Sequence, residues 1–470
     1  MSTSTTNKRD QLPSLLLLPF PPHPFNRTLL NAAYRPSLTA VLSKLKHAAN
    51  PHGASKKLII AVAIPILQGP PYQLRAKTLL WSQAQSLVAG LYAIISVICA
   101  RLGISTEMDD DDDDDGRSGK VSVDATVILV DHDRGRKPLS AEDKALRGGS
   151  GTSGGSLIET NNTVVVDLAS FAEAYHPWNY IFHVRTEQGI QLNEVYLQMA
   201  EGKMVGAANK IRQEQLVAVE GGLTLNQGLG LTSGAGGEGE GRKVSGVPVV
   251  CLGGTFDYLH PGHKLLLTAG ALLLGPPSKD ELSLPATSPR PRREPCKYLI
   301  GITGDELLKN KKFAEYVQSW ETRARNVIYF LSRLLQLSDK GWREATGPEA
   351  GVHIDEKDGD FRAAFRDGTI IVQCVRIQDA FGPTITEEDI DVLVVSGETR
   401  SGGKAVNDKR AEQGWKTLEV FEVDVLNADE IPEGVGEDVK GTEDFTSKIS
   451  STVIRQQRAA QATGRSEAKI

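Results

Sequence analysis

The sequence has few cysteines, no excess of positive charge and no long apolar runs, and each shortage excludes a class of protein. Its 470 residues contain four cysteines and no CxxC pair, so we expect neither a disulfide framework nor a zinc site. The 53 basic residues are outnumbered by 59 acidic ones, which argues against nucleic acid as a partner. We predict buried, reduced thiols at Cys99, Cys251, Cys296 and Cys374.

No stretch is long and apolar enough to predict a membrane partner. The best candidate, residues 86–100, ends at Arg101 and falls short of the ~20 residues needed to cross a bilayer. We interpret it as a buried helix. Prolines interrupt the short apolar run that follows Lys8 and Arg9, so no signal peptide is expected. We expect a cytoplasmic location, with the nucleus as a second one.

Composition divides the chain into two α/β regions joined by glycine. Apolar runs alternate with helical patterns over residues 57–218, which predicts a largely parallel sheet whose role the sequence does not indicate. Two low-complexity segments inside it, 109–115 and 146–156, are expected to be mobile loops. The predicted division is a partly disordered extension over 1–56, an α/β domain over 57–218, a glycine-rich linker over 219–243, a second domain over 244–460 and a tail over 461–470.

The second domain has the pattern of a doubly wound parallel sheet, which makes the fold class α/β with a Rossmann-like C-terminal domain. Insertions at 275–295 and 338–367 are expected to be loops without a core. The predicted strands are 247–252, 297–303, 369–375, 392–396 and 418–423, and the predicted helices include 263–274 and 320–337.

The stretch "GGTFDYLHPGH", residues 253–263, follows the first of these strands. Ligands bind at the carboxyl ends of parallel strands, where the next helix presents free N–H groups. The two glycines allow a ligand to approach the backbone, and His260 and His263 fall on one face of the helix start. The stretch therefore suits a phosphate. A structural role of the histidines as helix caps is the alternative.

The stretch resembles the HxGH motif of the nucleotidylyltransferase superfamily, and a second motif supports the resemblance. "DFTSKISSTVIRQ", residues 444–456, is similar to the superfamily's ISSS-type segment. With "LIGITGDELLKNKK" and "IQDAFGPTITEEDIDVLVVSGETR", residues 245–458 resemble the phosphopantetheine adenylyltransferases of coenzyme A synthesis in eukaryotes and archaea. The first half resembles the extra domain of fungal members only in pattern and position.

The resemblance implies an enzyme that transfers the adenylyl group of ATP to 4'-phosphopantetheine, giving dephospho-coenzyme A and pyrophosphate. His260 and His263 would contact the triphosphate, and Lys309 or Lys311 would lie between the phosphates of the two substrates. The implied nucleotide-binding residues are Gly253, Gly254, Thr255, Phe256, Gly262, Ser450, Ser451, Thr452 and Arg455, and the implied phosphopantetheine-binding residues are Asp379, Gly382, Pro383, Thr384, Arg400, Lys404 and Arg410.

The implied chemistry needs no general base, because the attacking phosphate is already an anion. Positioning and charge compensation suffice. Mg²⁺ is the expected cofactor, entering with ATP, and no residues are assigned as metal ligands. Other enzymes of coenzyme A synthesis are candidate partners. Bacterial relatives carry an arginine-rich stretch after the fourth strand, and here Arg400, Lys404 and Arg410 follow a different spacing, so the cation that replaces it stays open.

Two alternatives from other classes remain. A cytidylyltransferase for a phosphorylated alcohol shares HxGH but usually ends in an RTxGIST-like segment, which is absent here. A scaffold role within a coenzyme A complex is open because residues 1–240 show no legible chemistry. "GETRSGGKAV" fails as a Walker motif, since Ala405 stands where Ser or Thr is required.

A last prediction concerns the two halves of the chain. Because a glycine-rich tether implies few contacts, the sequence predicts that a fragment starting near Gly241 folds and acts alone.

Overall fold

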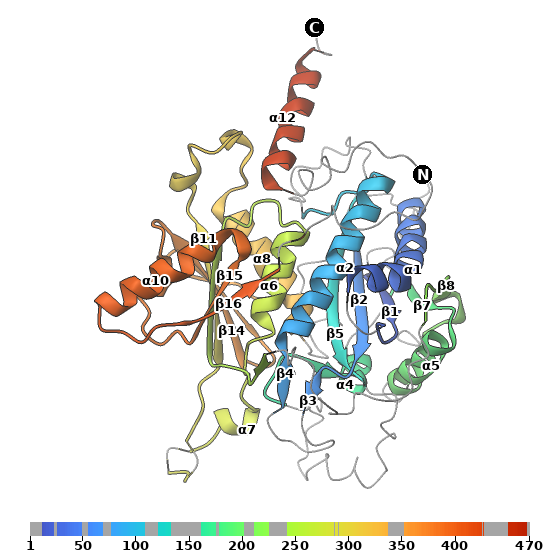
Figure 1. Ribbon diagram of the computed structural model, residues 1–470, viewed down its shortest axis with the longest axis horizontal. Coiled ribbons are helices and arrows are strands. Elements are labelled where there is room, and N and C mark those ends of the chain that lie inside the picture. The colour runs from blue at the N-terminus through green and yellow to red at the C-terminus, as the bar shows by residue number, and fades with distance from the viewer. Residues whose placement is uncertain are drawn as a thin grey trace, which may run out of the picture.

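The computed structural model forms two sheets with helices packed between them and on their outer faces (Figure 1). The predicted α/β fold class is confirmed, with six strands in the first sheet and seven in the second. The segments 109–115 and 146–156, and the stretch 225–241 of the glycine linker, lie outside the described part. The structure describes residues 12–22, 26–48, 55–68, 77–108, 121–132, 161–174, 178–201, 211–224, 242–285, 287–289, 291–336, 352–424, 426 and 450–467.

The first sheet is parallel throughout and doubly wound. Helices α1 (Arg27–His47) and α2 (Trp81–Leu102) cover one face, and α4 (Leu168–Ala174) and α5 (Glu187–Glu201) cover the other. Burial on both faces explains the continuous apolar runs. In the order β6-β5-β2-β1-β7-β8, the strands are β6 Val166–Asp167, β5 Val123–Asp131, β2 Lys56–Ile64, β1 Ser14–Leu18, β7 Ile181–Val184 and β8 Leu216–Val219.

Strand β1 corrects the expected start of the first α/β region. We assigned residues 1–56 to a partly disordered extension, but Ser14–Leu18 pairs with both β2 and β7 in the middle of the sheet. Leu16 and Leu18 pack toward α1 and α2, while Leu15 and Leu17 pack toward α4 and α5. A run of leucines bounded by prolines is thus a strand buried on both faces.

The second sheet repeats the doubly wound plan and adds an antiparallel edge. Helices α6 (Pro261–Ala271) and α8 (Trp320–Leu335) cover the face toward the first sheet, and α10 (Arg400–Glu412) covers the other. In the order β12-β13-β14-β11-β10-β15-β16, the strands are β12 Asp355–Lys357, β13 Asp360–Phe365, β14 Ile370–Ile377, β11 Cys296–Thr303, β10 Val249–Gly254, β15 Val392–Ser396 and β16 Glu419–Val423.

The antiparallel edge corrects the expectation that residues 338–367 lack a core. β13 pairs with β14, and its Phe361, Ala363 and Phe365 are buried. Their period-2 spacing is the pattern of a strand buried on one face. In the described part of the expected loop before β11, the one regular element is the one-turn helix α7 (Lys279–Leu282).

The two halves share one hydrophobic core, which contradicts the expectation of few contacts between them. Helix α2 packs against α6 (Figure 1), and Trp81 Nε1 donates a hydrogen bond to the carbonyl of Ala269 at 2.9 Å. A glycine-rich connection therefore says nothing about contacts made elsewhere. α2 is long and apolar enough to cross a membrane, but 78% of its most apolar window is buried inside the protein, as in the core helix of a globular protein.

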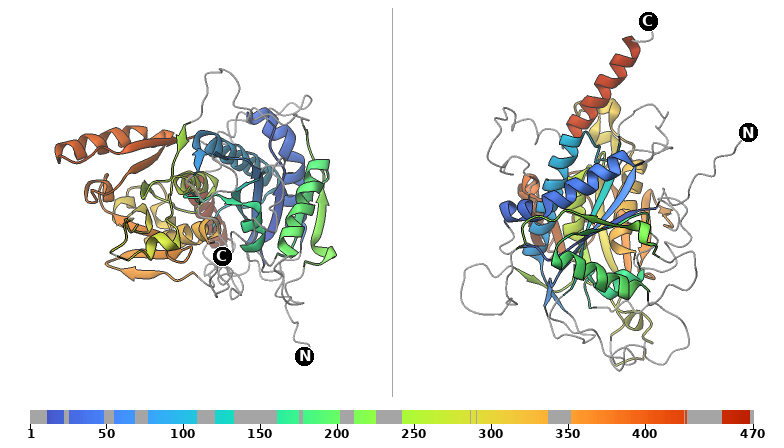
Figure 2. Two further views of the ribbon diagram at one scale, coloured as in Figure 1. Left: turned by 90° about the horizontal axis from the view of Figure 1, so that it is seen from below. Right: turned by 90° about the vertical axis from the view of Figure 1, so that its right-hand side faces the viewer.

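The remaining elements lie at the edges of the two halves. β3 (Leu67–Gln68), β4 (Thr78–Leu80) and β9 (Lys243–Val244) form a small sheet that crosses from one half to the other. Helix α12 (Ser451–Glu467) projects from the body (Figure 2) and extends into the residues expected as a tail.

All four cysteines are buried and unpaired, so the prediction of buried thiols is confirmed. The 3₁₀ helices are η3 Gln213–Gln215, η4 Asp305–Leu308, η5 Ala314–Tyr316, η6 Gly382–Ile385 and η7 Gly397–Thr399.

Candidate functional site

The carboxyl ends of five parallel strands meet at one edge of the second sheet. The chain winds from β10 through β11 to β14 on one side, and then through β15 to β16 on the other. The direction of winding reverses between β10 and β15. In sheets of this kind the ligand crevice lies outside such a reversal point. The loop that follows β10 therefore occupies the expected ligand position.

This loop begins at a glycine that packs closely against a buried ring. A Cβ atom on Gly254 would lie 2.9 Å from the ring of Phe256, and Phe256 itself has a φ of 54° and is fully buried. The Phe256 side chain therefore packs in the core. This corrects its assignment as a nucleotide-binding residue. Gly253 at the strand end is exposed. The buried ring anchors the loop that carries the two histidines.

The two histidines lie together at the N-terminus of α6. Their ring centroids are 3.9 Å apart with an interplanar angle of 22°, and a Cβ atom on Gly262 would be 3.1 Å from the His260 ring. His260 occupies the N-cap position, but its side chain makes no cap hydrogen bond, which contradicts the reading of this residue as a helix cap. The buried Nδ1 atoms of both rings have no partner among the described residues. A buried polar atom without a protein partner is uncommon and marks this pair as a candidate binding site.

Both imidazoles are held neutral. Burial, assisted by the ammonium group of Lys264, lowers the pKa of His260 to about 3. Burial also holds the pKa of His263 well below its usual value, and the nearby His260, Lys311 and Arg323 act in the same direction. The surroundings of the pair are therefore positive and partly dry. This environment favours an anion, whose charge would offset that of the cations.

The structure separates the two candidate lysines. Lys311 Nζ lies 3.3 Å from Thr255 Oγ1, directly beside the loop after β10, and burial lowers its pKa. Lys309 is largely exposed and forms an ion pair with Glu306. Spacing in the sequence could not choose between them. Lys311 is the lysine that lies next to the histidine loop.

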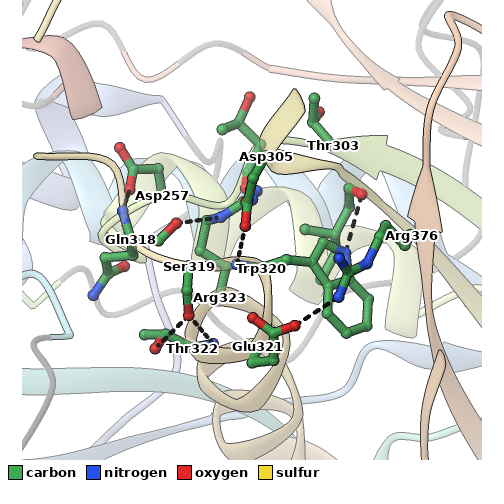
Figure 3. Close-up of polar contacts among 12 residues, drawn as sticks. Asp257, Thr303, Asp305, Gln318, Ser319, Trp320, Glu321, Thr322, Arg323 and Arg376 are labelled. Carbon is green, nitrogen blue, oxygen red and sulfur yellow. Dashed lines mark hydrogen bonds and ion pairs between the residues drawn. The ribbon is translucent and has the colours of Figure 1, made fainter. Parts of the chain in front are cut away.

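A buried arginine that sequence analysis missed, Arg323, lies beside Asp305 (Figure 3) and bonds to the loop after β10. Arg323 of α8 is fully buried; its Nη1 donates to the Thr255 carbonyl at 2.7 Å, and its Nη2 contacts Asp305 Oδ1 at 2.5 Å. Its Nε donates to the carbonyl of Gln318 at 3.0 Å. A signal was available, because Arg323 continues the apolar stripe of Val327 and Leu331 at helical spacing. A charge on such a stripe needs buried partners.

Helix α12 joins the site through Asp257, a second residue that sequence analysis left out. Asp257 is fully buried; its Oδ2 lies 2.5 Å from Arg455 Nη1, and its carbonyl accepts a hydrogen bond from Ser451 Oγ at 2.9 Å. Arg455 was assigned to the outer phosphates, but its guanidinium is buried and also contacts Thr452 Oγ1. It fastens α12 to the loop. Ser450, before the first turn of α12, is exposed.

The segment expected to face the pantetheine arm forms a tight turn after β14. Asp379 Oδ1 accepts hydrogen bonds from the N–H groups of Phe381 and Gly382. Gly382 has a φ of 53°, and a Cβ atom there would clash with Ile377. Pro383 and Thr384 are buried in η6.

Arg410 corrects an assignment. Its guanidinium is fully buried and donates to the carbonyls of Thr384, Glu387 and Glu388, so it braces this turn and is not available to a substrate phosphate. Its role is structural because each of its three guanidinium nitrogens donates to a backbone carbonyl, with Nε bonded to that of Lys416.

The other two candidate cations lie exposed on α10. Arg400 forms an ion pair with Glu422 at the end of β16, and Lys404 Nζ lies 2.8 Å from Asp408. Arg400 is at the start of α10, directly after β15 and η7. It therefore lies at the same sheet edge as the histidines, whereas Lys404 is paired along its own helix.

Comparison with known proteins gives two kinds of match. A family model described as a domain of unknown function (DUF8446) matches residues 1–225. The chain is 32% identical to the phosphopantetheine adenylyltransferase of Saccharomyces cerevisiae over 44% of this chain and 47% of that protein. It is 28% identical to the phosphopantetheine adenylyltransferase of Pyrococcus horikoshii over 38% of this chain and 79% of that protein.

An uncharacterised protein of Schizosaccharomyces pombe is 29% identical over 47% of this chain and 51% of that protein. The chain thus spans about half the length of the two yeast relatives. It is distantly similar to phosphopantetheine adenylyltransferases, and its residues 1–225 match a family model described as a domain of unknown function.

Proposed function

We propose that this chain transfers the adenylyl group of ATP to 4'-phosphopantetheine and releases pyrophosphate and dephospho-coenzyme A. The observation that carries the proposal is the stacked, neutral histidine pair at the N-terminus of α6. The pair lies at the reversal point of a doubly wound sheet, where phosphates bind. The distant similarity to phosphopantetheine adenylyltransferases supports the choice of substrates.

The chemical step exchanges one P–O bond for another. A phosphate oxygen of 4'-phosphopantetheine forms a bond to the α-phosphorus of ATP, and the bond from that phosphorus to the oxygen shared with the β-phosphate breaks. Pyrophosphate leaves with the electron pair of the broken bond. No proton has to be removed from the nucleophile, so the protein's task is to align the two phosphates and to compensate charge.

The residues beside the loop divide this task. His260 and His263 would donate hydrogen bonds to the oxygens of the transferring α-phosphate, where charge gathers in the transition state. Lys311, next to Thr255, would lie between the phosphates of the two substrates. The N-terminal end of α12, with Ser450, would hold the outer phosphates of ATP. The turn after β14 would face the pantetheine arm.

Magnesium would reach the site bound to ATP. The described residues contain no group of three or more His, Cys, Asp or Glu side chains able to hold a metal ion. The phosphate oxygens of ATP would supply the inner ligands of the ion. We assign no step to the ion.

Incubation of the full chain with Mg²⁺, ATP and 4'-phosphopantetheine tests the proposal. We expect equal amounts of pyrophosphate and dephospho-coenzyme A, measured by a coupled phosphate assay and by mass spectrometry. Parallel reactions with CTP and a phosphorylated alcohol test the cytidylyltransferase alternative. Turnover in those reactions alone would refute the proposal, and the absence of turnover in every reaction would favour a scaffold role.

A further inference from the structure

A buried cluster of three charges connects the two halves directly behind the histidine site. Asp124 on β5 of the first half contacts Lys264 of α6 and Arg333 of α8, both from the second half. Asp124 Oδ1 lies 2.7 Å from Lys264 Nζ, and Asp124 Oδ2 lies 2.5 Å from Arg333 Nη1. The three side chains are between 1% and 5% exposed. One carboxylate therefore bridges two helices that flank the loop after β10.

Lys264 is the residue that follows His263, and its own backbone N–H donates to the His260 carbonyl at 3.0 Å. Its side chain extends into the first half, where it also donates to the carbonyls of Thr106 and Ala125 at 3.3 Å. Every hydrogen bond of the ammonium group that the described residues show is therefore made to the first half. A shift of β5 relative to α6 would move the first turn of α6 and the histidines with it.

Two further contacts hold the same element. Trp81 Nε1 of α2 donates to Ala269 near the end of α6, and the N–H of Met108 donates to the carbonyl of Leu259, just before His260, at 3.3 Å. The first half thus contacts the histidine segment before, at and after its helix start.

We propose that Asp124 is a positioning residue for the histidine site, so that the first half is a working part of the catalytic unit. The inference rests on the proposed function for its kinetic consequences, but the geometry that it describes stands apart from any substrate. Asp124 contacts Lys264 and Arg333, not the groups placed at the reacting phosphates. It acts through Lys264, whose position sets the first turn of α6.

Joining the two halves by buried ion pairs, and not by apolar contacts, has a physical consequence. Removing three charged side chains from water is costly, and apolar residues of similar size are often at least as stabilising. A buried ion pair is, however, directional, because it is favourable over a narrow range of distances and angles. The cluster also carries a net positive charge beside His260, which adds to the attraction of the site for phosphate. Apolar packing would supply neither this directionality nor this positive charge.

The test uses the full chain and the double variant Asp124→Asn/Lys264→Met. This variant removes the tie but keeps the net charge of the cluster and leaves an amide oxygen for Arg333. We expect a folded protein whose kcat for adenylyl transfer falls by about tenfold to a hundredfold, the usual effect of a misplaced reacting group. The KM for ATP should change by less than about threefold, since alignment in the transition state is affected more than ground-state binding.

The matched control is Arg366→Gln. Arg366 also crosses between the halves, donating to the carbonyls of Thr163 and Val164 from a buried position. It lies before β14 begins, at the sheet edge opposite the histidines. Loss of this contact should lower the melting temperature and leave kcat within about twofold of the wild type. Equal losses of kcat in the control and the double variant would reduce the role of Asp124 to general stability and overturn the inference.

A second readout needs no turnover. Imidazole NMR signals of His260 and His263, assigned with single His→Gln variants, should shift or broaden in the double variant and stay in place in the control. Unchanged histidine signals in a folded double variant would overturn the inference, whether or not the chain proves to be an adenylyltransferase. If the double variant does not fold, Lys264→Met, which leaves Asp124 paired with Arg333, is measured in its place and judged by the same signals.

Discussion

The imidazole rings of His260 and His263 stack with their centroids 3.9 Å apart, and neither buried Nδ1 atom has a partner among the described residues. Two neutral imidazole rings at the N-terminus of a helix are placed to bind an anionic ligand.

Replacing either histidine by alanine should lower kcat by about 10² to 10³ while the fold persists, because one donor to the transferring phosphate is lost. Steady-state kinetics and circular dichroism measure the two effects. His353→Ala is the matched control, since that side chain is exposed on the approach to β12 and pairs with Asp355. Near-normal kcat with a sharply lower melting temperature in both site variants would show a structural role only.

The two lysines after η4 should differ in effect. Lys311→Met should lower kcat/KM by about tenfold or more, because Lys311 lies beside Thr255 and would compensate phosphate charge. Lys309→Met should change kcat/KM by less than about twofold, since Lys309 is exposed and paired with Glu306. The opposite ranking in a kcat/KM assay would assign the catalytic lysine to position 309.

His260 should make the protein less stable in acid. Its pKa is about 3 in the folded chain, whereas an unfolded histidine titrates near ~6.5. Between these values the unfolded state binds more protons, so the free energy of unfolding falls as the pH decreases from about 6.5 toward 3. Thermal unfolding of His260→Gln between pH 7 and pH 4 should be less sensitive to pH than that of the wild type. Parallel curves would show that His260 has the same pKa in the folded and unfolded states.

Breaking the buried pair of Asp257 and Arg455 should destabilise the protein and loosen α12. Arg455→Leu leaves a carboxylate buried without its partner, a change that typically costs ~3 kcal/mol or more. Arg400→Leu removes an exposed partner of Glu422 and should leave the denaturation midpoint unchanged. Urea denaturation measures both. A similar midpoint for the two variants would mean that the Asp257 site is open to water.

A fragment starting at residue 242 should fail to behave as an independent domain. Without the first half it exposes the α6 and α8 surface that packs against α2 and β5, and Lys264 loses Asp124. We expect aggregation or a non-cooperative thermal transition. A soluble monomer with a cooperative transition and full turnover would show that the second half is self-sufficient.

The sequence determined the parts of this protein that depend on local pattern. The β10 loop, the alternating strands and helices of the second half and the buried cysteines follow from residue type and spacing along one segment. β15 was predicted with the same bounds, Val392–Ser396, that it has in the structure. Such features depend on periods of 2 and 3.6 residues and on glycine, which act between neighbours in the chain.

Residues whose role depends on a distant partner were predicted less well. Arg410 and Arg455 read as available cations in the sequence, but the fold buries both against backbone or carboxylate. β13 was missed although Phe361, Ala363 and Phe365 have the spacing of a strand, because the elements that bury them, β14 and α8, lie in other segments of the chain.

The relation between the halves was decided by tertiary structure alone. Asp124 and Lys264 are 140 positions apart in the chain, and no local pattern marks either as the other's partner. The glycine-rich connection suggested independence, since a tether constrains only the residues next to it. The contact arises because two apolar faces, on α2 and on α6, bury each other and bring the charges together. Burial between distant segments is a property of the whole fold, so only the folded chain shows that the histidine site is supported by the first half.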